Sequence, residues 1–243
     1  MFYVRLTFEQ NKSLFEPLYL HITKMTMQKK MPAPRRELTL AEEIVNSITH
    51  GIGIPLSIAA LVILVVFAAQ RGDIWHVVSF SIFGASLILC YTASTLYHSF
   101  TNKRVKEIFA RFDHAAIFLL IAGTYTPILL TTLRGTLGWV LFGIIWGVAL
   151  TGIVIRSIYL YRFRKLMVAI YLIMGWMFVF ALRSVITNMP QISLIFLLSG
   201  GISYSVGTIF YAWRSLPFGH GIWHLFVLGG SVLHFFAILC TLC

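Results

Sequence analysis

Residues 141–155 read LFGIIWGVALTGIVI, a run with no charged side chain and no polar face at helical spacing. A helix on the surface of a soluble protein carries polar residues along one side, so this run is not typical of a soluble fold. It lies within a longer charge-free stretch, Gly135–Ile155, and a helix needs about 20 residues to cross the hydrocarbon core of a bilayer. We therefore expect this stretch to span a membrane.

The rest of the chain repeats this pattern. Of the 243 residues, 58% are hydrophobic and 11% are charged, whereas about a quarter are charged in soluble domains. Seven stretches of 17 or more residues lack Asp, Glu, Lys and Arg: Ile44–Gln70, Ile74–Asn102, His114–Leu133, Gly135–Ile155, Leu166–Leu182, Ser184–Trp213 and Ser215–Cys243. Arg183 can lengthen the shortest span by reaching to the interface. The sequence predicts an all-α, seven-transmembrane helix bundle over residues 37–243, preceded by a flexible N-terminal extension, residues 1–36.

The basic residues predict how the bundle is oriented. All but three of the 19 Lys and Arg residues precede the first stretch or lie in every second loop, and the other loops hold Arg71, Arg134 and Arg183, one each. Because basic loops stay in the cytoplasm, we expect a multi-pass protein of the cell membrane with a cytoplasmic N-terminus and an external C-terminus. The net charge of +11 then sits beside the membrane, so membrane lipids are the expected partners. Nucleic acid is not, because the loops lack interleaved aromatic residues for base stacking.

This topology gathers polar residues from four helices at the cytoplasmic edge. The first helix begins with EEIVNSITHG (42–51), the second ends with STLYHSF (94–100), the third begins with RFDHAAIF (111–118) and the seventh begins with FGHGIWH (218–224). Ionisable groups are costly in a bilayer, so they turn inward, find partners and commonly mark functional sites. We expect an intramembrane site near the cytoplasmic face.

Histidines at this edge suggest a metal. His220 and His224 are four residues apart and share one face of a helix, a spacing that lets two imidazoles bind one ion. His98, at a similar depth, is the expected third ligand. Three histidines and a water form an open Zn²⁺ site, which lowers the pKa of the water to about 7. Asp113 is then the candidate base for that water, and Ser94, one turn before His98, the candidate donor to an oxyanion.

Other histidines fit structural roles. A histidine near a membrane interface is usually a polar anchor, which we expect of three residues, His21, His76 and His114. His234 lies about 15 Å beyond His224 along the helix axis, too far to share an ion, so we expect it to form a hydrogen bond between helices. The metal trio itself has the same alternative, because two histidines at this spacing are a weak signal.

The remaining polar residues of the edge also have two interpretations. Asp113 is a candidate base, but an acid at the start of a helix is favoured electrostatically and it has a basic neighbour in Arg111. Glu42 and Glu43 are typical of a helix start. Asn46 and His50 are four residues apart and face the same way, so together with Glu43 they are expected to surround the metal ligands.

Taken in order, these motifs resemble the hemolysin III family, which belongs to one superfamily with the progestin and adiponectin receptors. The motifs are EEIVNSITHGIG, the Ser94–His98 spacing, FDHAAIFLLIAGTYTP and HGIWHLFVLGGSVLH, and the resemblance covers residues 36–243. It implies that His98, His220 and His224 bind zinc, that Asp113 contacts the metal through water, and that the site opens to the cytoplasm.

The resemblance extends, more distantly, to the alkaline ceramidases, which implies hydrolysis of an amide. We therefore expect a zinc-dependent hydrolase of an amide or ester bond in a membrane lipid, with a link to membrane homeostasis. One alternative is a receptor-like sensor of the membrane state with a structural zinc, although such sites usually have four protein ligands. The other is a cytolysin, as the family name suggests, although no helix shows a continuous polar stripe.

Overall fold

The computed structural model describes residues 38–213 and 215–243. The expected extension over residues 1–36, with His21, and the basic residue Arg214 lie outside the described residues. The helices are α2 (Leu40–Arg71), α3 (Ile74–Ser99), α4 (Lys103–Pro127), α5 (Thr136–Ile158), α6 (Arg164–Gly175), α7 (Leu182–Asn188), α8 (Gln191–Ala212) and α9 (Gly219–Leu239). A π-helical turn, Ile128–Thr132, continues α4, a 3₁₀ turn, Met177–Ala181, joins α6 to α7, and a 3₁₀ turn, Cys240–Leu242, ends α9.

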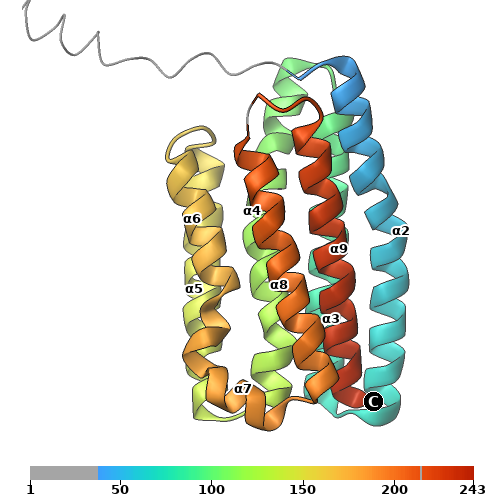
Figure 1. Ribbon diagram of the computed structural model, residues 1–243, viewed down its shortest axis with the longest axis vertical. Helices are drawn as coiled ribbons and strands as arrows, with labels where there is room; N and C mark the ends of the chain where they lie inside the picture. The colour runs from blue at the N-terminus through green and yellow to red at the C-terminus, as the bar shows by residue number, and fades with distance from the viewer. Residues whose placement is uncertain (1–37, 214) are drawn as a thin grey trace, which may run out of the picture. The chain divides into compact units, whose positions relative to one another are not determined.

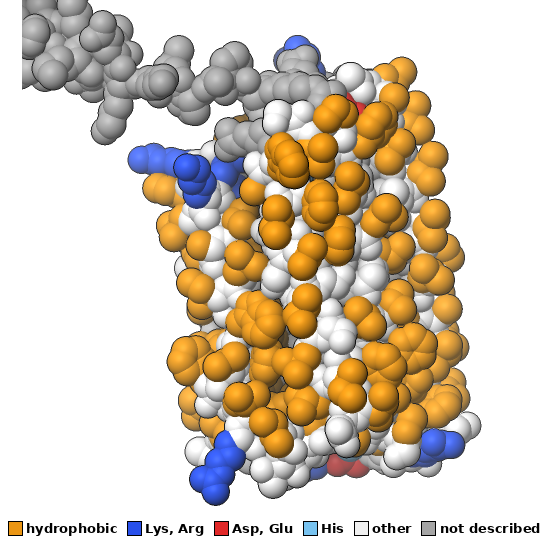
Figure 2. Space-filling view, in the orientation of Figure 1, with side chains coloured by type: hydrophobic (Ala, Val, Ile, Leu, Met, Phe, Trp, Pro, Cys, Tyr) orange, Lys and Arg blue, Asp and Glu red, His pale blue; other side chains and the backbone are white. Residues whose placement is uncertain are grey.

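Seven helical runs in the described residues are long and apolar enough to cross a membrane, which confirms the predicted fold. They lie side by side along the long axis of the bundle (Figure 1). The fifth run, Arg164–Asn188, is longer than its charge-free stretch, because the chain stays helical past Arg183. Hydrophobic side chains cover the face of the bundle shown in Figure 2, whereas Lys and Arg gather at its ends. The chain is therefore a multi-pass integral membrane protein.

Two hydrophobic clusters hold the helices together. Phe118 of α4 and Ile145 of α5, both fully buried, belong to a cluster that extends to α6 and α8. Leu64 of α2 and Phe80 of α3 belong to a second cluster that includes residues of α4 and α9. The extensive packing of α2 against α3, and of α9 against both α8 and α2, brings the first and last spans together.

Local signals set the helix ends near the candidate site. Thr39 and Glu42 form a capping box at the start of α2, in which each side chain bonds the backbone N–H of the other. The Asn102 side chain accepts hydrogen bonds from two backbone N–H groups at the start of α4. The start of α9 follows Phe218, whose φ of 55° is left-handed. With seven alternating spans, the starts of α2, α4 and α9 and the end of α3 fall at one end of the bundle.

Charged residues brace the opposite end. The Asp73 carboxylate caps α3 by accepting from the Trp75 and His76 backbone N–H groups, and it pairs with Arg134 at 2.7 Å. The hydrogen bond from the His76 side chain lowers the pKa of Asp73 to about 2. The Arg134 guanidinium also lies over the Trp75 ring, 5.2 Å from its centroid. This carboxylate therefore stays charged at neutral pH and links the α2–α3 and α4–α5 connections.

Cys243 offers a test of the predicted orientation. Its side chain is exposed at the end of the chain, whereas Cys90 is buried. In a Cys240→Ser variant, a membrane-impermeant maleimide is expected to label Cys243 in right-side-out vesicles, because the C-terminus is predicted to lie outside. As a control, exposed Thr101 at the other end of the bundle is changed to Cys, with Cys240 and Cys243 both changed to Ser, and should react only in inside-out vesicles. The reverse pattern of labelling would contradict the orientation.

Candidate metal centre

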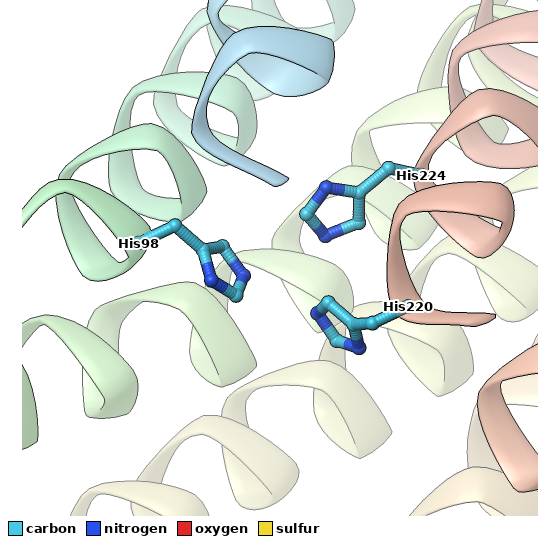
Figure 3. Close-up of side chains that lie close together, drawn as sticks. All are labelled: His98, His220 and His224. Carbon is cyan, nitrogen blue, oxygen red and sulfur yellow. The ribbon is translucent and has the colours of Figure 1, made fainter. Parts of the chain in front are cut away.

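The three predicted ligands come together in the structure. His98 lies in the last turn of α3, and His220 and His224 lie in the first two turns of α9. Each offers a ring nitrogen, and these nitrogens all lie within 4.8 Å of one another. The three rings face a common space between α3 and α9 (Figure 3). His98 and His224 are buried and His220 is half-buried, so the cluster lies inside the bundle at one end.

The hydrogen bonds of two ligands leave one nitrogen of each ring for an ion. Nδ1 of His98 lies 2.7 Å from Oε2 of Glu43, and Nδ1 of His224 lies 3.1 Å from the backbone oxygen of Asn46. Each Nδ1 therefore carries the hydrogen atom and donates the hydrogen bond. The lone pair of each Nε2 is then available to bind a metal ion. Both Nε2 atoms are buried and have no hydrogen-bond partner among the described residues. A buried unpaired polar atom costs about 1–3 kcal/mol, and a divalent cation that accepts imidazole nitrogen, such as Zn²⁺, fits these atoms.

Glu43 is held between His98 and a lysine. Its second oxygen, Oε1, accepts a hydrogen bond of 2.6 Å from Nζ of Lys106 at the start of α4. The Lys106 ammonium group also lies 5.3 Å from the centroid of the Tyr97 ring. These contacts place Glu43 beside His98, and its role in supporting a metal ligand stays a prediction. A carboxylate that orients a metal-binding histidine raises the basicity of the ring.

Asn46 and His50 also lie beside the three histidines. The His50 ring stacks on the His224 ring, with centroids 3.5 Å apart and planes 12° apart. Asn46 is fully buried, and a Cβ atom added to Gly221 of α9 would lie 3.2 Å from its Oδ1. The side-chain nitrogen and oxygen atoms of both residues are buried without a hydrogen-bond partner among the described residues. The space around the ligands is therefore lined with polar atoms that can bind water or a polar ligand.

Ser94 and Asp113 are both buried, but they differ in their contacts. Ser94 is 1% exposed, and its Oγ has no hydrogen-bond partner among the described residues. Asp113 is buried on α4, but it is not among the described residues whose ligand atoms lie within 4.8 Å of one another. Its carboxylate lies 3.7 Å from Nδ1 of His114. The catalytic roles of Ser94 and Asp113 therefore stay predictions.

The structural alternative for Asp113 is wrong in its details. Helix α4 begins at Lys103, well before Asp113, so this residue is inside the helix rather than at its start. Arg111 pairs with Glu107 at 3.0 Å rather than with Asp113. Neither helix capping nor an ion pair with Arg111 therefore accounts for a buried carboxylate at this position.

Three further histidines, His234, His76 and His114, have hydrogen-bond partners of their own. Nε2 of His234 donates a hydrogen bond of 3.2 Å to the backbone oxygen of Leu197 on α8, which confirms the helix–helix contact expected of it. His76 bonds Asp73 at the opposite end of the bundle, as an interfacial anchor would. Nδ1 of His114 donates to the backbone oxygen of Ala110 within its own helix.

Two contacts near the histidine cluster were not predicted from the sequence. Glu42, which is 2% exposed, accepts a hydrogen bond of 2.9 Å from the backbone nitrogen of Phe218, two residues before His220. Oγ1 of Thr49 lies 3.2 Å from Nδ1 of His224. A signal was present, because Glu42, Asn46 and His50 recur every four residues and all three are buried on one face of α2.

Comparisons with known proteins cover this site. The family model described as "Haemolysin-III related" matches residues 38–235. The chain is 52% identical over 201 residues to "Hemolysin-3 homolog" of Bacillus subtilis (strain 168), an alignment that covers 83% of this chain and 94% of that protein. It is 51% identical over 198 residues to "Hemolysin-3" of Bacillus cereus, covering 82% and 90%. It is 29% identical over 220 residues to the human "Monocyte to macrophage differentiation factor", covering 87% and 90%.

Metal analysis tests the cluster directly. The purified protein is expected to retain about one Zn²⁺ per chain after desalting, measured by elemental mass spectrometry, because three histidines form a complete catalytic-type ligand set. His98→Ala and His224→Ala should each lose most of this metal. His76→Ala, at the opposite end of the bundle, should keep it. Equal metal content in His98→Ala and the wild type would contradict the site.

Proposed function

The chain belongs to the haemolysin-III related family, and we propose that it is a zinc-dependent hydrolase that cleaves an amide or ester bond in a membrane lipid. The observation that supports this proposal most directly is the histidine cluster, in which two buried Nε2 atoms lack hydrogen-bond partners among the described residues. Three protein ligands leave a fourth position open, which is typical of catalytic rather than structural zinc sites.

In this proposal Asp113 and Ser94 carry out the proton transfer and the stabilisation of charge that hydrolysis needs. When bound, zinc polarises a carbonyl and lowers the pKa of a water molecule to about 7. Asp113 accepts the proton of the attacking water and returns it to the leaving amine or alcohol. The hydroxyl of Ser94, buried one turn before His98, donates a hydrogen bond to the oxyanion that develops on the carbonyl oxygen. Water adds to the carbonyl carbon, the carbon–nitrogen or carbon–oxygen bond breaks, and a fatty acid is released.

The position of the cluster suits a lipid substrate. The ligands lie within a turn or two of the helix ends, at the level where the spans meet the predicted cytoplasmic interface. The amide or ester of a membrane lipid lies at this same level, between the headgroup and the acyl chains. A substrate can therefore present its reacting bond to the cluster while its chains stay in the bilayer.

A second candidate function is a receptor-like sensor in which the zinc is structural. Its support is that the ligands join α3 to α9, while α2 contacts the ligand rings through Glu43 and Asn46. An ion at this point would tie three helices together. This function predicts a large loss of thermal stability when metal is removed, without any turnover.

Hydrolysis is tested with a ceramide or another N-acyl lipid in mixed micelles, with the released fatty acid measured by mass spectrometry. Asp113→Asn is expected to abolish turnover while zinc content is unchanged, because the amide cannot accept the proton. Ser94→Ala should lower kcat by about 10²-fold, the usual loss of one oxyanion donor.

Glu107→Gln is the matched control, since Glu107 is an exposed acid on the same helix, and it should keep wild-type activity. Turnover by Asp113→Asn at the wild-type rate would refute the role of Asp113. If the zinc-loaded wild type releases no fatty acid from N-acyl or ester lipids, and chelation lowers its melting temperature, the structural function replaces the enzymatic one.

A further inference from the structure

Helix α2 contributes no ligand to the histidine cluster, yet it contacts the ligands of both other helices. Glu43 bonds the His98 ring, and the backbone of Asn46 bonds the His224 ring. These contacts fix the orientations of two ligands. The third ligand, His220, lies in the first turn of α9, so its place depends on how that turn is held.

The start of α9 is an unusual helix end. Phe218 precedes the helix with φ of 55°, a left-handed conformation that a side chain rarely adopts, and it provides no side-chain cap. The first N–H groups of a helix have no partner within it, so they need acceptors from elsewhere. Conformations of this kind are strained and persist only where surrounding contacts hold them. Such a contact must therefore come from another part of the protein.

Glu42 provides that contact from α2. Its Oε1 accepts the hydrogen bond of 2.9 Å from the backbone nitrogen of Phe218. Its Oε2 accepts from the backbone nitrogen of Thr39 at 2.9 Å and from the Thr39 hydroxyl at 3.1 Å. Both carboxylate oxygens are thus held, one by each helix start, and the side chain is buried. A negative charge is also favourable at the positive N-terminal end of α9.

The two helix starts are tightly packed around this contact. A Cβ atom added to Gly221 would lie 3.0 Å from Cγ1 of Val45, so the first turn of α9 lies directly against α2. His220 is the neighbour of Gly221 and follows Phe218 by two residues. A shift of the first turn would therefore move the His220 ring relative to His98 and His224.

We propose that Glu42 is a positioning residue of the metal centre, which fixes the first turn of α9 and so sets the place of the His220 ring. This inference rests on the metal binding that the proposed function requires, but it does not rest on hydrolysis. Substitution of a residue that supports a metal ligand typically lowers metal affinity by about 10–100-fold. The effect of substituting Glu42 on zinc affinity is expected to fall in that range.

The test measures zinc affinity of the full chain in detergent by competition with a chromophoric chelator. Glu42→Ala is expected to bind zinc about 10–100-fold more weakly than the wild type. Thr39→Ala is the matched control, because it removes the hydroxyl of the α2 cap and its bond to Oε2 of Glu42, but leaves the bonds that Glu42 accepts from the backbone N–H groups of Thr39 and Phe218. It should lower the melting temperature while zinc affinity stays at the wild-type value. Should Glu42→Ala not purify as a monodisperse protein, Glu42→Asp, whose shorter side chain withdraws from Phe218, should show the same weakening.

A second measurement separates positioning from general stability. In a His220→Ala background, Glu42→Ala should cause no further loss of affinity, because its effect acts through the ligand that is already missing. The visible spectrum of the Co²⁺-loaded protein should also change in Glu42→Ala and not in Thr39→Ala, because the spectrum reports the arrangement of ligands.

Three results would overturn the inference: wild-type zinc affinity in Glu42→Ala, an equal loss of affinity in Thr39→Ala, or the absence of zinc binding in the wild type. A protein that binds zinc as expected but hydrolyses no lipid would refute the proposed hydrolase and leave the role of Glu42 standing.

Discussion

A polar atom inside a bilayer has no water to bond, so it needs a partner from the protein. In this protein the backbone meets that need through seven helical spans, and the Thr39–Glu42 and Asn102 caps satisfy N–H groups where α2 and α4 begin. Some buried side chains also bond the backbone, as the Nε2 atom of His234 does with α8. Among the described residues, most of the buried side-chain atoms without a hydrogen-bond partner belong to His98, His224 and the residues beside them, and the others belong to Arg156, Ser193 and His234. Because such atoms are expensive, their concentration at one end of the bundle marks the site more clearly than the number of histidines does.

The fold was predictable because the membrane imposes a simple rule. A charge-free stretch must be long enough to cross the hydrocarbon, and the seven stretches satisfied that rule without any tertiary information. The histidine cluster followed from the same rule, since alternation of the spans places the end of α3 and the start of α9 at one level. The sequence predicts only in part that the fifth helix continues past Arg183. A charged residue near the interface can belong to a span, and packing decides how far that span extends.

The parts of the site that the sequence did not reveal depend on contacts between distant residues. Glu42 is typical of a helix start, and it does form part of the cap of α2. Its other carboxylate oxygen, however, accepts a hydrogen bond from the backbone of Phe218, which is far away in the sequence. Phe218 makes this bond from a left-handed backbone, which no residue preference predicts, because phenylalanine rarely adopts it. Asp113 was misplaced for a related reason: the cap at Asn102 starts α4 earlier than the charge pattern suggests.

The order of the contributing helices has a consequence for biogenesis. The residues that support the ligands are in the first described span, one ligand is in the second, and the other two are in the last. A nascent chain thus inserts Glu42, Asn46 and His98 into the membrane long before their partners on α9 are synthesised. The histidine cluster is completed only when the final span enters the bilayer, so the proposed metal binding would be the last step of assembly, and a chain truncated before α9 would leave Glu42, Asn46 and His98 without their partners.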